Sequence, residues 1–335
     1  MTGNIKIAVD AMGGENSPKK VIDGILENYK QNKDIIYNIF GDKEKIKSLL
    51  PKNFNTKIFN IVNTKNKILD TDSPLSAAKK GKDTSMWLTI ESVKNNESDV
   101  AISAGNTGAL FVISKLNLKM IENIDKPALS ALWPNKKNFN VVLDLGANIE
   151  CSEKNLIDFS IMGASLFKSL YPNDNPEVAL LNIGSEELKG NDIIKNAYQN
   201  LQNNKNKNFN FRGYIEGNNI MKGEVNVIVT DGFTGNIALK TAEGTANFIM
   251  NEFKNSMTSN ILGKISSLIN INNLKNFKNK LDPRLYNGAI LIGLNSPVIK
   301  SHGSTDYIGF SHSLNVCIKI VKNNLIQKIK ENIIK

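Results

Sequence analysis

The chain is poor in the residues that build disulfide frameworks, metal centres and histidine-dependent active sites. Its 335 residues include two cysteines and two histidines. Cys151 and Cys317 have no metal-type spacing, and so few cysteines favour a reducing compartment. With only His302 and His312 present, a Ser-His-Asp hydrolase has few candidate residues.

Long apolar runs and several common signatures are also missing. No apolar stretch approaches the roughly 20 residues that span a bilayer. The opening residues MTGNIKIAVDAMGG do not read as a signal peptide, since their apolar run is short and already contains Asp10. The patterns G-x-G-x-x-G, G-x-x-x-x-G-K-[ST], H-E-x-x-H and G-x-S-x-G do not occur. We therefore expect a cytoplasmic protein that rests on a membrane peripherally and does not cross it.

Acidic residues are fewer than basic ones, 32 against 42, so the chain has a net charge of +10 and a pI near 9.3. Lys, Asn and Ile are abundant everywhere, which genome base composition explains. The functional alternative is attraction to phosphates, to an acidic protein or to an acidic membrane surface. Because the lysines are spread along the chain, we predict no nucleic-acid partner. The hydrophobic fraction of 41% can bury a large core, as one domain over residues 1–335 or as two lobes.

One pattern recurs along the chain: a compact β-branched run, a loop of Gly, Asn, Asp or Ser, and then a helical segment. The runs are nearly continuous in apolar residues, which is typical of strands covered on both faces. They are IKIAVD (5–10), IIYNIF (35–40), DVAISA (99–104), NVVLDL (140–145), VALLNI (178–183) and VNVIVT (225–230). This repetition predicts an α/β fold with three layers, a mostly parallel sheet between helices.

In such a sheet, ligands bind beyond the carboxyl ends of the strands. The loop after VALLNI reads GSEELKGND, and its small residues let the backbone approach a ligand closely. Amides at the following helix N-termini also attract anions. Tight turns alone explain any one such loop, but several loops of this kind share the same sheet edge.

The polar residues in these loops predict a site that binds an oxyanion and polarises a carbonyl. Lys189 and Lys300 are the candidate cations. His302 is the candidate proton carrier, with a structural role in its loop as the equal alternative. Asp10 and Asp231 could bind a metal, but orienting a lysine is the commoner role. The remaining candidates are Gly13, Gly14, Asn106, Thr107, Asn148, Ser185, Asn191, Thr234, Asn236, Ser301 and Ser304.

Residues 245–280 differ from the rest because bulky apolar residues recur at helical spacing opposite Asn, Ser and Lys. They predict one or two amphipathic helices. Such helices could face the core or a dimer partner, or could form a helical tip on an anionic membrane.

Six ordered motifs resemble the bacterial acyl-acyl-carrier-protein:phosphate acyltransferases over nearly the whole chain. They are IAVDAMGGENSP, AISAGNTGAL, LDLGAN, LLNIGSEELKGN, TDGFTGNIALKTAEG and GLNSPVIKSHGSTD. The resemblance implies a fold like that of isocitrate/isopropylmalate dehydrogenases or phosphotransacetylases, and a homodimer. It implies transfer of a fatty acyl chain from acyl carrier protein to inorganic phosphate, giving an acyl phosphate. A membrane acyltransferase would then use that product to acylate glycerol 3-phosphate in phospholipid synthesis.

This sequence departs from the family pattern at several places, including SHGSTD, where Thr305 stands in the more usual HGSSD, and the amphipathic region, which diverges most. The usual GGDHAP reads Gly13-Gly14-Glu15-Asn16-Ser17-Pro18, so the family histidine is absent and catalytic weight moves towards His302. The usual GGAP reads Asn287-Gly288-Ala289-Ile290.

From the resemblance and the residues together, we expect Lys189 and Lys300 to clamp phosphate and His302 to balance protons. Asn106, Asn191 and Asn236 would donate to phosphate or to the acyl carbonyl. No metal and no cofactor is expected, because lysines and backbone amides can carry the charge.

Three alternatives remain open at this point. The first is a phosphotransacetylase-like enzyme that uses acyl-CoA. The second is a dehydrogenase of the related fold, which the missing dinucleotide fingerprint disfavours. The third is a non-catalytic scaffold that recruits carrier protein to the membrane. The two polar loops that carry Lys189 and Lys300 disfavour it, because a scaffold does not need an anion site.

Overall fold

The computed structural model describes residues 4–172, 174–203, 208–280 and 282–333. These residues form one continuous sheet of 11 strands in the order β3-β2-β1-β4-β11-β10-β5-β6-β9-β7-β8. The strands are β1 (Lys6–Asp10), β2 (Ile36–Gly41), β3 (Phe59–Asn63), β4 (Val100–Ser103), β5 (Ala128–Pro134), β6 (Phe139–Leu143), β7 (Glu177–Asn182), β8 (Asn210–Glu216), β9 (Val227–Val229), β10 (Ala289–Ile292) and β11 (Val298–Lys300).

The sheet contains two parallel groups that are joined by antiparallel strands. Strands β3, β2, β1, β4 and β11 run parallel to one another, as do β6, β9, β7 and β8. Between them, β10 pairs antiparallel with both β11 and β5, and β5 pairs antiparallel with β6. The mostly parallel sheet is therefore confirmed, and the six predicted runs became β1, β2, β4, β6, β7 and β9.

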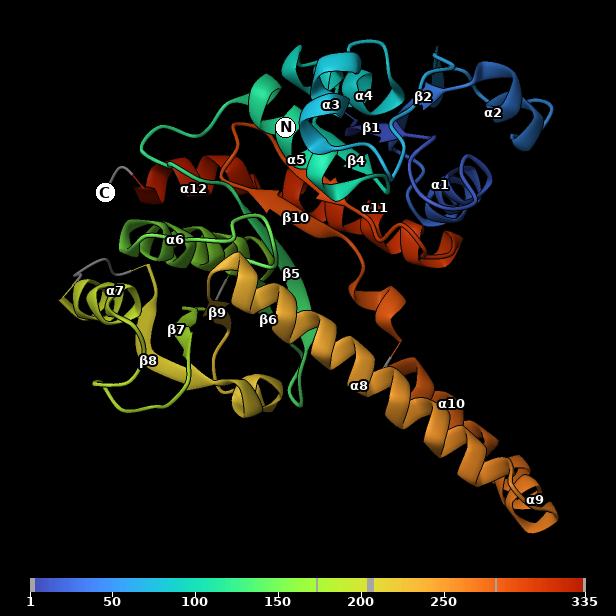
Figure 1. The fold of residues 1–335 in the computed structure, drawn as a ribbon. Coiled ribbons are helices and arrows are strands. Elements are labelled where there is room, and N and C mark those ends of the chain that lie inside the picture. The colour runs from blue at the N-terminus through green and yellow to red at the C-terminus, as the bar shows by residue number, and fades with distance from the viewer. Residues whose placement is uncertain (1–3, 173, 204–207, 281, 334–335) are drawn as a thin grey trace.

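Helices cover both faces of the sheet (Figure 1). They are α1 (Lys19–Gln31), α2 (Lys43–Leu49), α3 (Pro74–Lys80), α4 (Ser85–Lys94), α5 (Thr107–Leu118), α6 (Glu153–Leu170), α7 (Asp192–Asn203), α8 (Gly232–Thr258), α9 (Ile261–Ile269), α10 (Ile271–Lys280), α11 (Tyr307–Lys322) and α12 (Leu325–Ile333), with 3-10 turns η1 (Gly217–Lys222) and η2 (Pro283–Tyr286).

The core lies on both faces because successive strand residues point in opposite directions. In β1, Ile7 and Val9 join a cluster with residues of α1, α6 and α11, whereas Ala8 joins a second cluster with residues of α4 and α5. In β6, Val142 joins a third cluster, against which the first turns of α8 pack. This double coverage explains why the strands read as continuous apolar runs.

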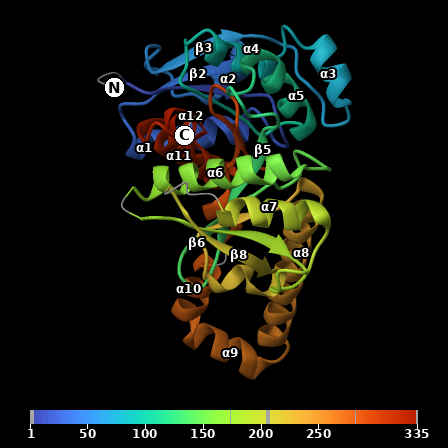
Figure 2. The ribbon, with the colours of Figure 1, turned by 90° about the vertical axis from the view of Figure 1, so that its left-hand side faces the viewer.

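The end of α8 together with α9 and α10 protrudes from the molecule as a helical hairpin (Figures 1 and 2). We call residues 245–280 the hairpin. Its helices α9 and α10 lie within the predicted amphipathic segment, and several large apolar side chains on it are exposed: Phe248, Ile249, Ile261, Leu262, Ile265, Leu268 and Ile269. Among the described helices, none has a segment long and apolar enough to cross a membrane.

The first turn of α8 is pressed directly against the loop after β6. A Cβ added to Gly235 would collide with the backbone carbonyl oxygen of Asp144. Only glycine, which has no Cβ, allows the two backbone segments to come so close. The start of α8 is thereby fixed relative to the loop at residues 144–148.

Gly235→Ala should therefore destabilise the protein by about 3 kcal/mol, because the helix or the loop must shift to admit the methyl group. Urea unfolding gives the measurement. Gly244→Ala on the same helix is the matched control, since a methyl group there would meet no atom within 4 Å. That control should be neutral or stabilising by up to about 1 kcal/mol. Equal stability of the two variants would contradict the close contact.

Candidate active site

Polar loops gather at the carboxyl ends of three adjacent parallel strands, β1, β4 and β11. We call these loops, together with the start of α1, the first loop cluster. It comprises residues 10–20, 103–107 and 300–306. Several of the predicted site residues come into this cluster at the strand ends or just beyond them, among them Asp10, Gly14, Lys300 and His302.

Lys300 is the last residue of β11, and its ammonium is held by backbone carbonyls. Its Nζ donates to the oxygen of Ser301 at 2.5 Å and to that of Ala104 at 3.4 Å. Burial, followed by the charge of Lys20, lowers the pKa of Lys300 to about 8, against the opposing charges of Asp70 and Asp10.

Lys20, which the sequence reasoning missed, supplies a second ammonium to the same loop. It lies in the first turn of α1, is buried, and donates from Nζ to the carbonyl oxygen of Gly303 at 2.5 Å. Burial lowers its pKa, while Glu15 and Asp70 oppose the shift. A signal existed in the sequence, because Lys20 falls on the same helical stripe as the buried Gly24 and Asn28. A lysine at a buried helix position is unusual unless it has partners.

Asp10 and the two glycines shape the floor of this cluster. The buried Asp10 carboxylate accepts from Ser103 Oγ at 2.6 Å and from the Met12 amide at 3.1 Å. Gly13 lies against Gly105. Gly14 has φ of +81°, and a Cβ there would lie 3.0 Å from Lys20 Nζ. The backbone therefore passes directly beside the ammonium group, where a side chain would crowd it.

His302 is exposed beside the two lysines, and its ring is oriented by Ser304. The Ser304 amide donates to His302 Nδ1 at 3.3 Å, and Ser304 Oγ lies 3.0 Å from the same nitrogen. An Nδ1 that accepts from an amide places the proton of the neutral ring on Nε2. Desolvation and the charges of Lys240 and Lys300 lower the pKa of His302. The ring is thus mainly neutral near pH 7, with Nε2–H as a hydrogen-bond donor.

Three other predicted donors of this cluster have different surroundings. Ser301 is buried, and its Oγ accepts from Asn287 and Ser313. Asn106 caps α5 and donates from Nδ2 to the carbonyls of residues 69, 70 and 72, which brings the Asp70 loop towards the lysines. Thr107 is exposed at the start of α5. The amide of Asn106 is therefore already used to position Asp70.

A second loop cluster follows β6, β9 and β7, which are also neighbours in the sheet. It comprises residues 144–148, 183–191 and 231–236. The buried Asp144 accepts from the amides of Leu129, Ala147 and Asn148 and from Asn148 Nδ2. Burial raises the pKa of this carboxyl. Asn148 also donates to the Pro127 carbonyl, so its amide braces the loop.

The start of α8 brings further predicted residues to this cluster. Asp231 caps the helix and accepts from the Thr234 amide and from Thr234 Oγ1, each at 2.8 Å. Asn236 is exposed and lies over Gly146, where a Cβ would come within 3.4 Å of the Asn236 side chain.

The β7–α7 loop holds the other predicted residues. Asn191 Oδ1 accepts from the Ile194 amide, and the Lys189 carbonyl accepts from Asn182 Nδ2. The side chains of Ser185 and Lys189 are exposed. Lys189 lies in the loop after β7, and the ammonium group that the structure brings to the loop beside Lys300 is that of Lys20.

Helix α8 links the two clusters electrostatically. Asn236, Lys240 and Glu243 share one face of this helix, being four and three residues apart. The charges of Lys240 and Glu243 act on His302 in the first cluster. Lys240 and Glu243 therefore lie near enough to His302 to affect its pKa, and Asn236 is one turn before Lys240 on the same face of α8.

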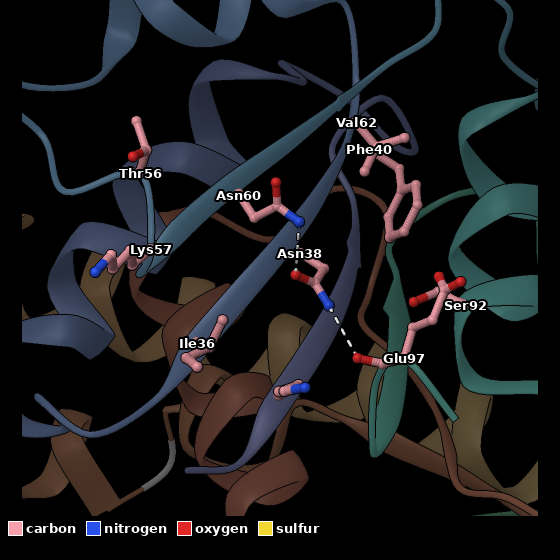
Figure 3. Close-up of a pocket in the computed structure, with 10 residues that line it drawn as sticks. Ile36, Asn38, Phe40, Thr56, Lys57, Asn60, Val62, Ser92 and Glu97 are labelled. Atoms are coloured by element: carbon pink, nitrogen blue, oxygen red, sulfur yellow. Dashed lines mark hydrogen bonds between the residues drawn. The ribbon is translucent and has the colours of Figure 1, made fainter. Parts of the chain in front are cut away.

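A cavity lies away from these residues. It has a volume of about 520 Å³ and opens beside the amino ends of β1, β2 and β3 (Figure 3). Its centre is an asparagine pair, in which Asn60 donates to Asn38 and Asn38 donates to the Glu97 carbonyl. No predicted site residue lines it. Over the residues that the structure describes, no cluster of His, Cys, Asp and Glu suits a metal ion.

Comparison with known proteins adds to this geometry. A family model described as "Fatty acid synthesis protein" matches residues 5–328. The phosphate acyltransferase of Pelagibacter ubique (strain HTCC1062) is 71% identical over 99% of this chain and 100% of its own length. The phosphate acyltransferase of Ehrlichia canis (strain Jake) is 43% identical over 97% of this chain and 98% of its own length. A solved phosphotransacetylase from Streptococcus pyogenes superimposes with a TM-score of 0.62 at 15% identity, over 97% of this chain and 94% of that one, which shows a shared fold.

The affinity of the site for a dianion should fall as pH rises through about 8, because Lys300 loses its proton there. An ordinary lysine would keep its charge about two units higher. Sulfate is a suitable probe for calorimetry because its own charge is constant over this range. Lys300→Arg should abolish the loss, since arginine stays protonated. Identical pH dependence in both proteins would exclude Lys300 as its source.

Proposed function

The chain belongs to the phosphate acyltransferase family, and we propose that it transfers a fatty acyl group from acyl carrier protein to inorganic phosphate. The observation that carries this proposal is the pair of ammonium groups, Lys20 and Lys300, held at one loop beside His302. Among the described residues neither ammonium forms an ion pair with a carboxylate, and two such cations withdrawn from water suit a small dianion.

Phosphate bound at this pair needs no covalent enzyme intermediate. One phosphate oxygen attacks the thioester carbon, a C–O bond forms, and the carbonyl oxygen becomes an oxyanion. The C–S bond then breaks, giving acyl phosphate and a thiolate. In our proposal the proton of the attacking hydrogen phosphate ends on that thiolate, and neutral His302 hydrogen-bonds the departing sulfur through Nε2–H, because Ser304 occupies Nδ1. Catalysis is then mostly positioning and charge stabilisation.

Asn236 and Lys189 are proposed to serve the acyl donor. The Asn236 side chain is exposed on the same face of α8 as Lys240, whose charge acts on His302. The exposed Lys189 lies in the loop after β7, which is next to β9, the strand that precedes α8. Donors so placed can stabilise the oxyanion from the side opposite phosphate.

A fatty chain is supported by apolar side chains around the second loop cluster. Large apolar residues at the ends of β6, β7 and β9 are 51–88% exposed, and they stand beside polar site residues: Ile149, Ile183, Leu188, Phe233 and Ile237. Exposed apolar groups next to a polar site favour a substrate with a long hydrocarbon portion.

The hairpin is proposed to give the protein its membrane contact. Its exposed apolar residues alternate with lysines such as Lys254 and Lys275, as expected of helices on an anionic surface. A cytoplasmic, peripherally bound homodimer could then pass acyl phosphate to a membrane glycerol 3-phosphate acyltransferase. Membership of an enzyme family leaves no reason to retain the non-catalytic scaffold.

The purified protein should form acyl phosphate from acyl-carrier-protein and phosphate, and more slowly from acyl-CoA.

Lys20→Met should raise the phosphate KM by about tenfold to a hundredfold through loss of a charged contact. Lys19→Met is the matched control, because Lys19 is exposed and pairs with Asp23.

Lys189→Ala should instead lower kcat; a wild-type rate would remove Lys189 from the mechanism.

In the comparison of acyl donors with the unmodified protein, faster turnover of acyl-CoA than of acyl-carrier-protein would identify a phosphotransacetylase-like enzyme.

Ile261→Asp combined with Ile265→Asp should abolish sedimentation with anionic phospholipid vesicles, since charges there oppose insertion of an apolar face. Turnover of soluble acyl-carrier-protein should persist. Leu116→Asp on α5, another exposed apolar site, is the control. Unchanged vesicle binding, or a dimer that dissociates in the variant, would assign the hairpin to subunit contact instead.

A further inference from the structure

Asn287 lies between the hairpin and β10 in the sequence, and it contacts the loop that carries His302. It follows the turn η2 as its C-cap residue, directly before β10. Its Oδ1 accepts from the His302 amide at 2.9 Å, and its Nδ2 donates to Ser301 Oγ at 3.0 Å and to the Gly309 carbonyl at 2.9 Å. One half-buried amide group therefore contacts the loop at its start and reaches the helix that follows it.

The segment held by Asn287 also holds both lysines. The Ser301 carbonyl accepts from Lys300, and the Gly303 carbonyl accepts from Lys20. A shift of this loop would move the two acceptors that fix the ammonium groups. The loop is anchored a second time at Asp306, whose carboxylate accepts from the Gly309 amide and from Arg284.

We propose that Asn287 is the positioning residue of the phosphate site, fixing the residue 301–306 loop so that Lys20, Lys300 and His302 address one anion. This inference rests on the proposed function, and it adds a residue outside the loops that contact substrate. Asn287 acts through the loop and does not touch phosphate itself.

The contacts need a donor and an acceptor in one planar group. Aspartate has the same shape but only acceptors, so it would face the Gly309 carbonyl without a proton to share. Alanine removes every contact. The two variants therefore separate loss of the tether from addition of a charge.

Calorimetry with inorganic phosphate tests the tether. Asn287→Ala should weaken phosphate binding about tenfold, because roughly three neutral hydrogen bonds are lost. Activity should show the same change mainly in the phosphate KM. Asn295→Ala is the matched control: Asn295 Nδ2 also donates to a backbone carbonyl, that of Met120 at 2.8 Å, beside β10 but away from the loop. It should leave phosphate affinity unchanged.

NMR titration of the two histidines provides a readout that does not depend on turnover. The charged groups that face His302 are Lys300 on β11, Lys20 on α1, and Lys240 and Glu243 on α8. Asn287→Asp adds a carboxylate beside the His302 amide and should raise the pKa of His302 by about one unit. Asn287→Ala should move it much less, and His312→Gln assigns the second signal.

The outcomes separate the two proposals. Phosphate binding that is absent from the wild type would overturn the proposed function. Normal wild-type binding, with phosphate affinity unchanged in Asn287→Ala and the His302 titration unchanged in Asn287→Asp, would overturn only the role of Asn287. Should the alanine variant fail to fold, the aspartate variant, which keeps the shape and the acceptor, is measured in both assays.

Discussion

The architecture of the site follows from the repulsion between two ammonium groups that are held at one loop. Lys20 and Lys300 are both withdrawn from water, and the charge of Lys20 further lowers the pKa of Lys300. Carbonyl dipoles from residues 301, 303 and 104 satisfy their protons without neutralising their charge. Such a pair is stable only if the acceptors are fixed, and it is completed by an anion. The anchoring of the loop and the phosphate binding proposed above thus answer one electrostatic problem.

The antiparallel strands β5 and β10 explain why the polar loops form two clusters. They reverse the sheet between its two parallel groups, so the carboxyl ends of β1, β4 and β11 point opposite to those of β6, β9 and β7. Helix α8 nevertheless connects the two clusters. It begins in the second cluster, and the charges of its Lys240 and Glu243 act on His302 in the first. The glycine contact at the start of α8 fixes the direction in which that face points.

Much of the fold was predictable because doubly covered strands carry their own signal. The runs at β1, β2, β4, β6, β7 and β9 are apolar throughout, and Lys300 and His302 stand where a strand passes into a polar loop. The strands β3 and β8 at the sheet edges have exposed residues and lack this signal. Lys20 was missed because a lysine in a first helical turn resembles an ordinary solvated residue. Its burial depends on the loop at residue 303, which is 283 positions away.

Asparagine posed the harder problem, because a helix cap and a ligand donor need the same amide. Of the asparagines predicted as donors, Asn106 and Asn148 use Nδ2 to brace loops, whereas Asn191 caps α7 through Oδ1 alone. Asn236 differs from those two: across the described residues its side chain has no hydrogen-bond partner, and it is exposed on the same face of α8 as Lys240. Asn287, by contrast, has every donor and acceptor engaged. An amide committed to backbone can position a site, whereas an uncommitted one can bind substrate. The structure thereby separates asparagines by their hydrogen bonding, which composition and spacing could not do.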